Sequence, residues 1–145
     1  LGPDDAYLIT RGLRTLDVRL DKHEKSAKQV AEFLSNYKNI KLLYPHKKDS
    51  FNFRMWKKYY SGASGLMGLK IKSKNKNSVI KFVNSLKLFG YGYSWGGFKS
   101  LVTARQYKRD GKWVHDGKHL IRLNIGLEDT KDLISDIKSS FSTLN

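Results

Sequence analysis

An arginine stands in the middle of an apolar strand pattern near the end of this sequence. Ile121, Leu123 and Ile125 recur at every second position, which is typical of a strand with one buried face. Arg122 and Asn124 then point to the opposite face. That face is either solvated, or it is a site where the planar guanidinium binds a carboxylate or phosphate through paired hydrogen bonds. Composition alone does not choose between the two.

A segment earlier in the chain, residues 91–101, combines aromatic side chains with glycines. Ser94 and Trp95 carry side-chain hydrogen-bond donors, and the two glycines that follow permit a sharp turn or close approach to a ligand. The competing interpretation is that Trp95 and Phe98 are core aromatics beside a turn. If this segment lies next to Arg122, the two would form a small pocket for an anionic ligand.

The composition predicts one folded domain. The chain has 145 residues, 39% of them hydrophobic and 12% aromatic, which suffices for a core of its own. No apolar run is long enough to cross a bilayer, and there is no signal pattern, so we expect a cytoplasmic location without membrane contact. The chain has no cysteine, which excludes a disulfide, a thiolate metal site and a cysteine nucleophile. It also does not start with Met. We therefore expect a fragment of a longer protein.

The net charge of +15 raises the question of nucleic acid as a partner. The lysines are spread along the whole chain, which is typical of solvated faces. Basic and aromatic residues mix between positions 51 and 60, where they could stack on bases. The same mixture suits an amphipathic helix with lysines reaching to solvent. We prefer the helix and do not expect a nucleic-acid partner.

The hydrophobic pattern predicts an α+β fold with about four mostly antiparallel strands, helices on one face and a long N-terminal helix. Glycine at position 12 suggests a bend in that first helix. We interpret the charged segment 103–119 as a loop or partial helix. The expected helices are 4–36, 52–60, 75–86 and one beginning after Asp129, and the expected strands are 40–44, 66–71, 89–93 and 120–125.

Five segments, met in the expected order, resemble the carboxy-terminal domain of the Cys/Met-metabolism family of enzymes that use pyridoxal phosphate (PLP). The form Ser-Trp-Gly-Gly is similar to the cystathionine β-lyase branch of that family. The segments are 2–7 (Gly-Pro-Asp-Asp-Ala-Tyr), 11–16 (Arg-Gly-Leu-Arg-Thr-Leu), 60–66 (Tyr-Ser-Gly-Ala-Ser-Gly-Leu), 93–101 (Tyr-Ser-Trp-Gly-Gly-Phe-Lys-Ser-Leu) and 121–129 (Ile-Arg-Leu-Asn-Ile-Gly-Leu-Glu-Asp).

The resemblance implies that residues 1–145 form a single small fold type I domain that follows a large PLP-binding domain. In the family, the position of Arg122 binds the substrate's α-carboxylate, Ser94 and Trp95 match positions beside it, and Tyr7 matches one near the mouth of the active site. No lysine lies in a segment like the family's cofactor-lysine motif. We therefore expect no catalytic, PLP-binding or metal-binding residue in this chain, and no turnover by the chain alone.

The implied reaction is β-elimination of L-cystathionine to homocysteine, pyruvate and ammonia, a step towards methionine, in a homotetramer. One alternative is another activity of the same family, a cystathionine γ-synthase or γ-lyase. Alternatives of other classes are a basic RNA-binding α/β module and a domain kept only for interaction.

Overall fold

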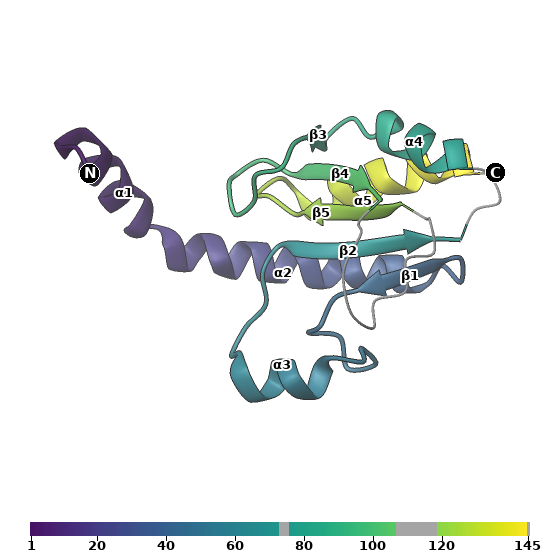
Figure 1. Ribbon diagram of the computed structural model, residues 1–145, viewed down its shortest axis with the longest axis horizontal. Helices are drawn as coiled ribbons and strands as arrows, with labels where there is room; N and C mark the ends of the chain where they lie inside the picture. The colour runs from purple at the N-terminus through teal and green to yellow at the C-terminus, as the bar shows by residue number, and fades with distance from the viewer. Residues whose placement is uncertain (73–75, 107–118, 145) are drawn as a thin grey trace.

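The computed structural model describes residues 1–72, 76–106 and 119–144, and it has the expected α+β architecture (Figure 1). The last element is the 3-10 turn η1 (Phe141–Leu144). The helices are α1 (Pro3–Leu13), α2 (Leu16–Ser35), α3 (Phe53–Tyr59), α4 (Lys76–Ser85) and α5 (Thr130–Ser140), and the strands are β1 (Ile40–Leu43), β2 (Leu66–Ile71), β3 (Gly90–Tyr91), β4 (Leu101–Arg105) and β5 (Leu120–Asn124).

The five strands form one sheet in the order β1-β2-β5-β4-β3. Neighbours pair antiparallel, except that β3 runs parallel to β4. Arg122 on the central strand β5 lies opposite Gly68 on β2 and Thr103 on β4. The prediction of about four strands was one short, because β4 falls across the segment that we interpreted as a loop or partial helix.

The core lies between one face of the sheet and the helices α2, α4 and α5, as the alternating pattern predicts. Its strand side consists of the residues that alternate with the Arg122 face. The members from the sheet are Met67, Leu69, Ile71, Val102, Ile121 and Leu123, and those from the helices are Ala27, Val30, Ala31, Leu34, Val79, Phe82, Val83, Leu133 and Ile137.

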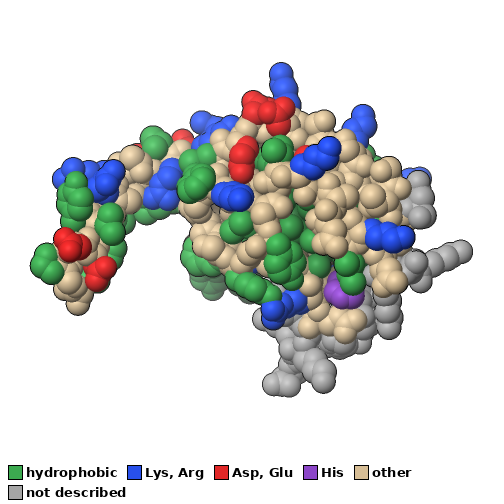
Figure 2. All heavy atoms as spheres, turned by 90° about the horizontal axis from the view of Figure 1, so that it is seen from above, with side chains coloured by type: hydrophobic (Ala, Val, Ile, Leu, Met, Phe, Trp, Pro, Cys, Tyr) green, Lys and Arg blue, Asp and Glu red, His purple; other side chains and the backbone are tan. Residues whose placement is uncertain are grey.

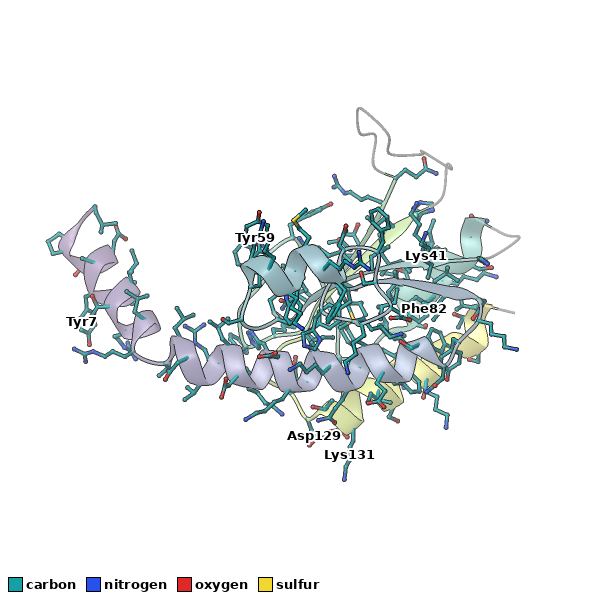
Figure 3. The ribbon with its side chains drawn as sticks, turned by 90° about the horizontal axis from the view of Figure 1, so that it is seen from below. Tyr7, Lys41, Tyr59, Phe82, Asp129 and Lys131 are labelled. Carbon is teal, nitrogen blue, oxygen red and sulfur yellow. The ribbon has the colours of Figure 1, made fainter. Side chains whose placement is uncertain are left out.

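The long N-terminal helix is broken between α1 and α2, close to the glycine where a bend was expected. Figure 1 shows α1 extending away from the sheet beyond the start of α2. None of its residues is buried. At the other end of the chain, α5 begins where expected, and the Asp129 side chain caps it by accepting from the backbone N–H of Lys131 at 2.8 Å (Figure 3).

Within the described residues, no helix combines the length and the apolar character that a bilayer crossing requires.

Candidate functional site

Arg122 lies under the loop formed by residues 92–99. Its Nη2 donates to the backbone carbonyls of Gly92 (3.2 Å), Tyr93 (2.7 Å) and Ser94 (3.1 Å). The side chain is half-buried, and it forms no ion pair with any carboxylate of the described residues. The sequence did not decide whether the Arg122 face is solvated. In the structure, the loop covers this face at Arg122.

The guanidinium keeps donor capacity that the described residues do not use. Its Nε is buried and has no hydrogen-bond partner among them. A buried donor without a partner costs roughly 1–3 kcal/mol. An anion that reached the guanidinium would relieve part of this cost, and Arg suits carboxylates because its donors form a planar fork.

Asn124, two residues further along β5, holds the same loop. Its Oδ1 accepts from the backbone N–H of Gly96 at 3.0 Å, and its Nδ2 donates to the carbonyl of Lys99 at 3.2 Å. The side chain is only 1% exposed. Arg122 and Asn124 share a face of the strand, so one strand fixes both the beginning and the end of the loop.

The loop's return to β4 is fixed by Glu128. This carboxylate accepts from the backbone N–H of Ser100 at 2.7 Å and from its hydroxyl at 2.8 Å. The hydroxyl in turn accepts from the backbone N–H of Gly126 at 2.8 Å. A Cβ at position 126 would collide with the carbonyl of Phe98, so glycine is required for this close approach.

Helix α2 contacts the loop from the opposite side. Arg19 Nη1 donates to the carbonyl of Gly96 at 3.3 Å. One helical turn on, His23 is 1% exposed and lies against the backbone of Gly97. Burial lowers the pKa of His23, the Arg19 charge lowers it further, and the contacts with Gly97 and Glu128 oppose the shift.

The aromatic side chains of the loop are exposed. Trp95 is 65% exposed, Phe98 is 75% exposed, and Ser94 is exposed as well. The alternative that Trp95 and Phe98 are core aromatics is therefore wrong. Tyr93 is also exposed, and the Arg105 guanidinium lies 4.5 Å from its ring centroid. The loop thus presents an indole and a hydroxyl to solvent on a rigidly held backbone.

The structure brings Ser94 to Arg122 and places Trp95 next to it in the loop, but it does not bring Tyr7 there. Tyr7 lies on α1, which extends away from the sheet, and its ring is 63% exposed (Figure 3). The Arg11 guanidinium lies 5.8 Å from the ring centroid. The role of Tyr7 near the mouth of the active site stays a prediction for the complete protein.

Sequence reasoning missed four residues that hold the loop: Asn124, Glu128, Arg19 and His23. Asn124 could have been found, because it shares a strand face with Arg122. Glu128 comes just before the helix expected after Asp129, and nothing in that position indicates a contact with the loop. The spacing of Arg19 and His23 places them on one face of a helix, but nothing in the sequence says that this face meets the loop.

A separate hollow of about 1080 Å³ lies between α2 and α3. Trp56 lines it and donates to the carbonyl of Gly62 at 3.1 Å, and Glu24 lines it from α2, paired with Lys28 at 2.6 Å. It is open to solvent. The part of the chain that the structure describes contains no group of His, Asp and Glu residues able to hold a metal ion.

Comparison with known proteins identifies a family over nearly the whole chain. The family model described as "Cys/Met metabolism PLP-dependent enzyme" matches residues 1–142. The chain is 38% identical to cystathionine beta-lyase of Escherichia coli (strain K12), over 97% of this chain and 38% of that protein. It is 36% identical to the L-alanine/L-glutamate racemase of Wolbachia pipientis wMel, over 97% of this chain and 36% of the relative.

Among solved structures, the chain is similar to a putative O-acetylhomoserine (thiol)-lyase from Campylobacter jejuni. The TM-score is 0.80 at 33% identity, covering 98% of this chain and 33% of the other. That structure contains N'-pyridoxyl-lysine-5'-monophosphate at its position 205. The chain thus spans between a third and two fifths of the length of each of these relatives.

Proposed function

We propose that this chain, which belongs to the Cys/Met metabolism family of PLP-dependent enzymes, is the small domain that binds the substrate's α-carboxylate. In this proposal Arg122 is the main carboxylate ligand, and Ser94 and Trp95 stand beside it. The observation that carries the proposal is the position of the half-buried Arg122 guanidinium, in contact with the Ser94 carbonyl and without a described carboxylate partner.

The chemical role of such a site is orientation. A carboxylate held by a fixed guanidinium keeps the substrate's Cα–H bond in one direction relative to the group that removes the proton, and orientation of this kind is worth several kcal/mol. Three carbonyls restrain the guanidinium of Arg122, so it need not be ordered when substrate arrives. The exposed indole of Trp95 offers one further N–H donor.

PLP is the cofactor of the family, and when bound it serves as an electron sink. A lysine that carries it must be held in a desolvating environment that favours the neutral amine. None of the lysines whose burial the structure describes is buried. The described residues do not fit the cofactor by themselves, so we assign its binding to a large domain that precedes this one.

For the complete enzyme we propose β-elimination of L-cystathionine to homocysteine, pyruvate and ammonia, in the cytoplasm and as a homotetramer. The identity to cystathionine beta-lyase over nearly the whole chain supports this choice. The similar identity to an L-alanine/L-glutamate racemase makes the reaction the point to test. The assay follows pyruvate, 2-oxobutanoate and amino-acid racemisation in parallel. Pyruvate from cystathionine supports the proposal, and either of the other products alone contradicts it.

The carboxylate site is tested by Arg122→Lys in the complete enzyme. Lysine keeps the charge but loses the planar fork, so we expect kcat/KM for cystathionine to fall about 100-fold, in line with the loss of an oriented, charged hydrogen-bonding group. The matched control is Arg54→Lys on the exposed face of α3, which should leave kcat/KM unchanged. An unchanged kcat/KM in Arg122→Lys removes Arg122 from the site.

A further inference from the structure

Two different elements of the fold hold the backbone of Gly96 in the loop. Its N–H donates to Asn124 on β5 at 3.0 Å, and its carbonyl accepts from Arg19 on α2 at 3.3 Å. Gly96 also has φ of +74°, the left-handed conformation in the loop's turn. The residue just before it, Trp95, is exposed, so its direction depends on this backbone.

Arg19 uses all three of its nitrogens. Besides Gly96, its Nη2 donates to the carbonyl of Gly12 at 2.6 Å, and its Nε donates to the hydroxyl of Thr15 at 3.3 Å. Gly12 lies in the last turn of α1, where carbonyls lack a helical partner. Arg19 therefore joins three places: the end of α1, the start of α2 and the turn of the loop.

No described carboxylate forms an ion pair with Arg19, so backbone carbonyls and one hydroxyl account for its contacts. A guanidinium suits this task because its donors diverge in a plane and can reach two carbonyls at once, which a lysine ammonium on a flexible stem does less well. The nearby His23 adds a second contact from the same helix face, at Gly97.

We propose that Arg19 is a positioning residue for the carboxylate site: it fixes the Gly96 peptide, and through it Ser94 and Trp95, relative to the junction of α1 and α2. This inference rests on the proposed function for its catalytic consequence. The contacts of Arg19 with Gly96, Gly12 and Thr15, which we call the clamp, lie within the described residues and can be tested without any substrate. Arg19 touches neither substrate nor cofactor in this proposal and acts through the loop.

The first experiment measures amide hydrogen exchange by NMR in the ¹⁵N-labelled chain. In Arg19→Met, we expect the Gly96 amide to exchange about tenfold faster relative to the core amide of Leu123, because a charged hydrogen bond to the same residue is lost. Arg14→Met is the matched control: it removes the same charge from the exposed neighbouring junction and should change neither amide. An unchanged Gly96-to-Leu123 ratio in Arg19→Met overturns the clamp.

If Arg19→Met fails to fold, Arg19→Lys takes its place, since it keeps the charge and the stem. It should still speed Gly96 exchange relative to Leu123, by a smaller factor. A ratio equal to that of the unmodified chain would again overturn the proposal.

The second experiment measures steady-state kinetics in the complete enzyme. We expect Arg19→Met to lower kcat/KM for cystathionine about tenfold, and to add little to the defect of Arg122→Lys, because both variants disturb the same carboxylate site. Full additivity of the two effects overturns a shared role. If Arg122→Lys has no effect, the carboxylate assignment fails on its own, while the exchange ratio still decides whether Arg19 clamps the loop.

Discussion

Two parts of the fold, strand β5 and the loop above it, determine the environment of Arg122. Its place on the outward face of β5 follows from alternation in the sequence, and the structure confirms that face. Whether the face was solvated or part of a site depended on the loop above it. That contact joins residues about thirty positions apart, and no local pattern reports such a pairing.

A second residue-scale feature is the buried imidazole of His23. Burial lowers its pKa in the folded chain, so below the ordinary value of about 6.5 the unfolded chain takes up a proton that the folded chain resists. The stability that His23 contributes is therefore present above pH 6.5 and is lost as pH falls below it. We expect the urea concentration at the midpoint of unfolding to decrease as the pH is lowered from 7 to 5. The decrease should be smaller in His23→Gln.

His46 is the control for this measurement, because its pKa is also lowered, mainly by burial and then by Lys28. His46→Gln should remove its own share of the pH dependence and leave that of His23. The carboxyl groups of Glu24 and Asp49, with lowered pKa values, titrate below this window. Identical pH profiles for His23→Gln and the unmodified chain would contradict the assignment.

At the scale of elements, the loop 92–99 behaves as a built part of the fold. It is held by side chains of β5 and of α2, and the backbone N–H of Gly92 at its start donates to the carbonyl of Val102 on β4 at 3.2 Å. Its exposed aromatic side chains therefore stand on a restrained backbone. This is the arrangement that a preorganised binding loop requires.

Two adjacent glycines in the loop provide a matched pair of substitutions. Gly96 has φ of +74°, and a Cβ there meets no atom, so Gly96→Ala should cost about 1 kcal/mol from backbone strain alone. Gly97 has no positive φ and is equally open, so Gly97→Ala should be close to neutral. Urea unfolding of both variants measures the difference. Equal effects would show that the left-handed turn is not required.

Helices α4 and α5 are joined through one carboxylate. Asp136 accepts from the backbone N–H groups of Lys87 (3.0 Å) and Leu88 (2.9 Å), just after α4 ends. Asp136→Ala leaves both donors without a partner and should lower the free energy of unfolding by about 2 kcal/mol. Asp132→Ala, on the exposed face of the same helix, should cost below about 1 kcal/mol. Both free energies of unfolding are measured with urea. Equal decreases for the two variants would contradict the role of Asp136 in joining α4 to α5.

The sequence predicted the strongly periodic elements and missed a short one. Helices α3, α4 and α5 and strands β1, β2, β3 and β5 lie within a few residues of their expected positions, and the one expected helix 4–36 is divided into α1 and α2. Strand β4 follows the glycine-rich loop and soon becomes polar, so its pattern is too short to see. Its antiparallel pairing with β5 stabilises it as a strand, although its own sequence pattern does not predict one. The rest of the segment interpreted there, residues 107–118, lies outside the described residues.

At the scale of the whole molecule, the family was predictable and is confirmed by the match over residues 1–142. The net charge of +15 has no single location. Figure 2 shows lysines and arginines scattered over the visible face, among apolar and acidic side chains. A scattered charge of this kind favours solubility more than the recognition of one polyanion.

The whole chain also carries a prediction about the cofactor. Adding PLP to the chain alone should give no stoichiometric adduct trapped by borohydride, because none of the lysines whose burial is described is buried. Absorbance at the Schiff-base band and mass spectrometry of the reduced chain measure this. A one-to-one adduct at a single lysine would contradict the division of labour that we propose between two domains.

The outlying first helix has a physical consequence. α1 has 11 residues, and Tyr7, Leu8, Ile9 and Leu13 stand in water on it. A segment of this length gains too little from its own backbone to persist in solvent, and it has no packing to make up the deficit. Without such packing, α1 should unfold and refold repeatedly in water, and burial of its apolar side chains against another apolar surface would stabilise it.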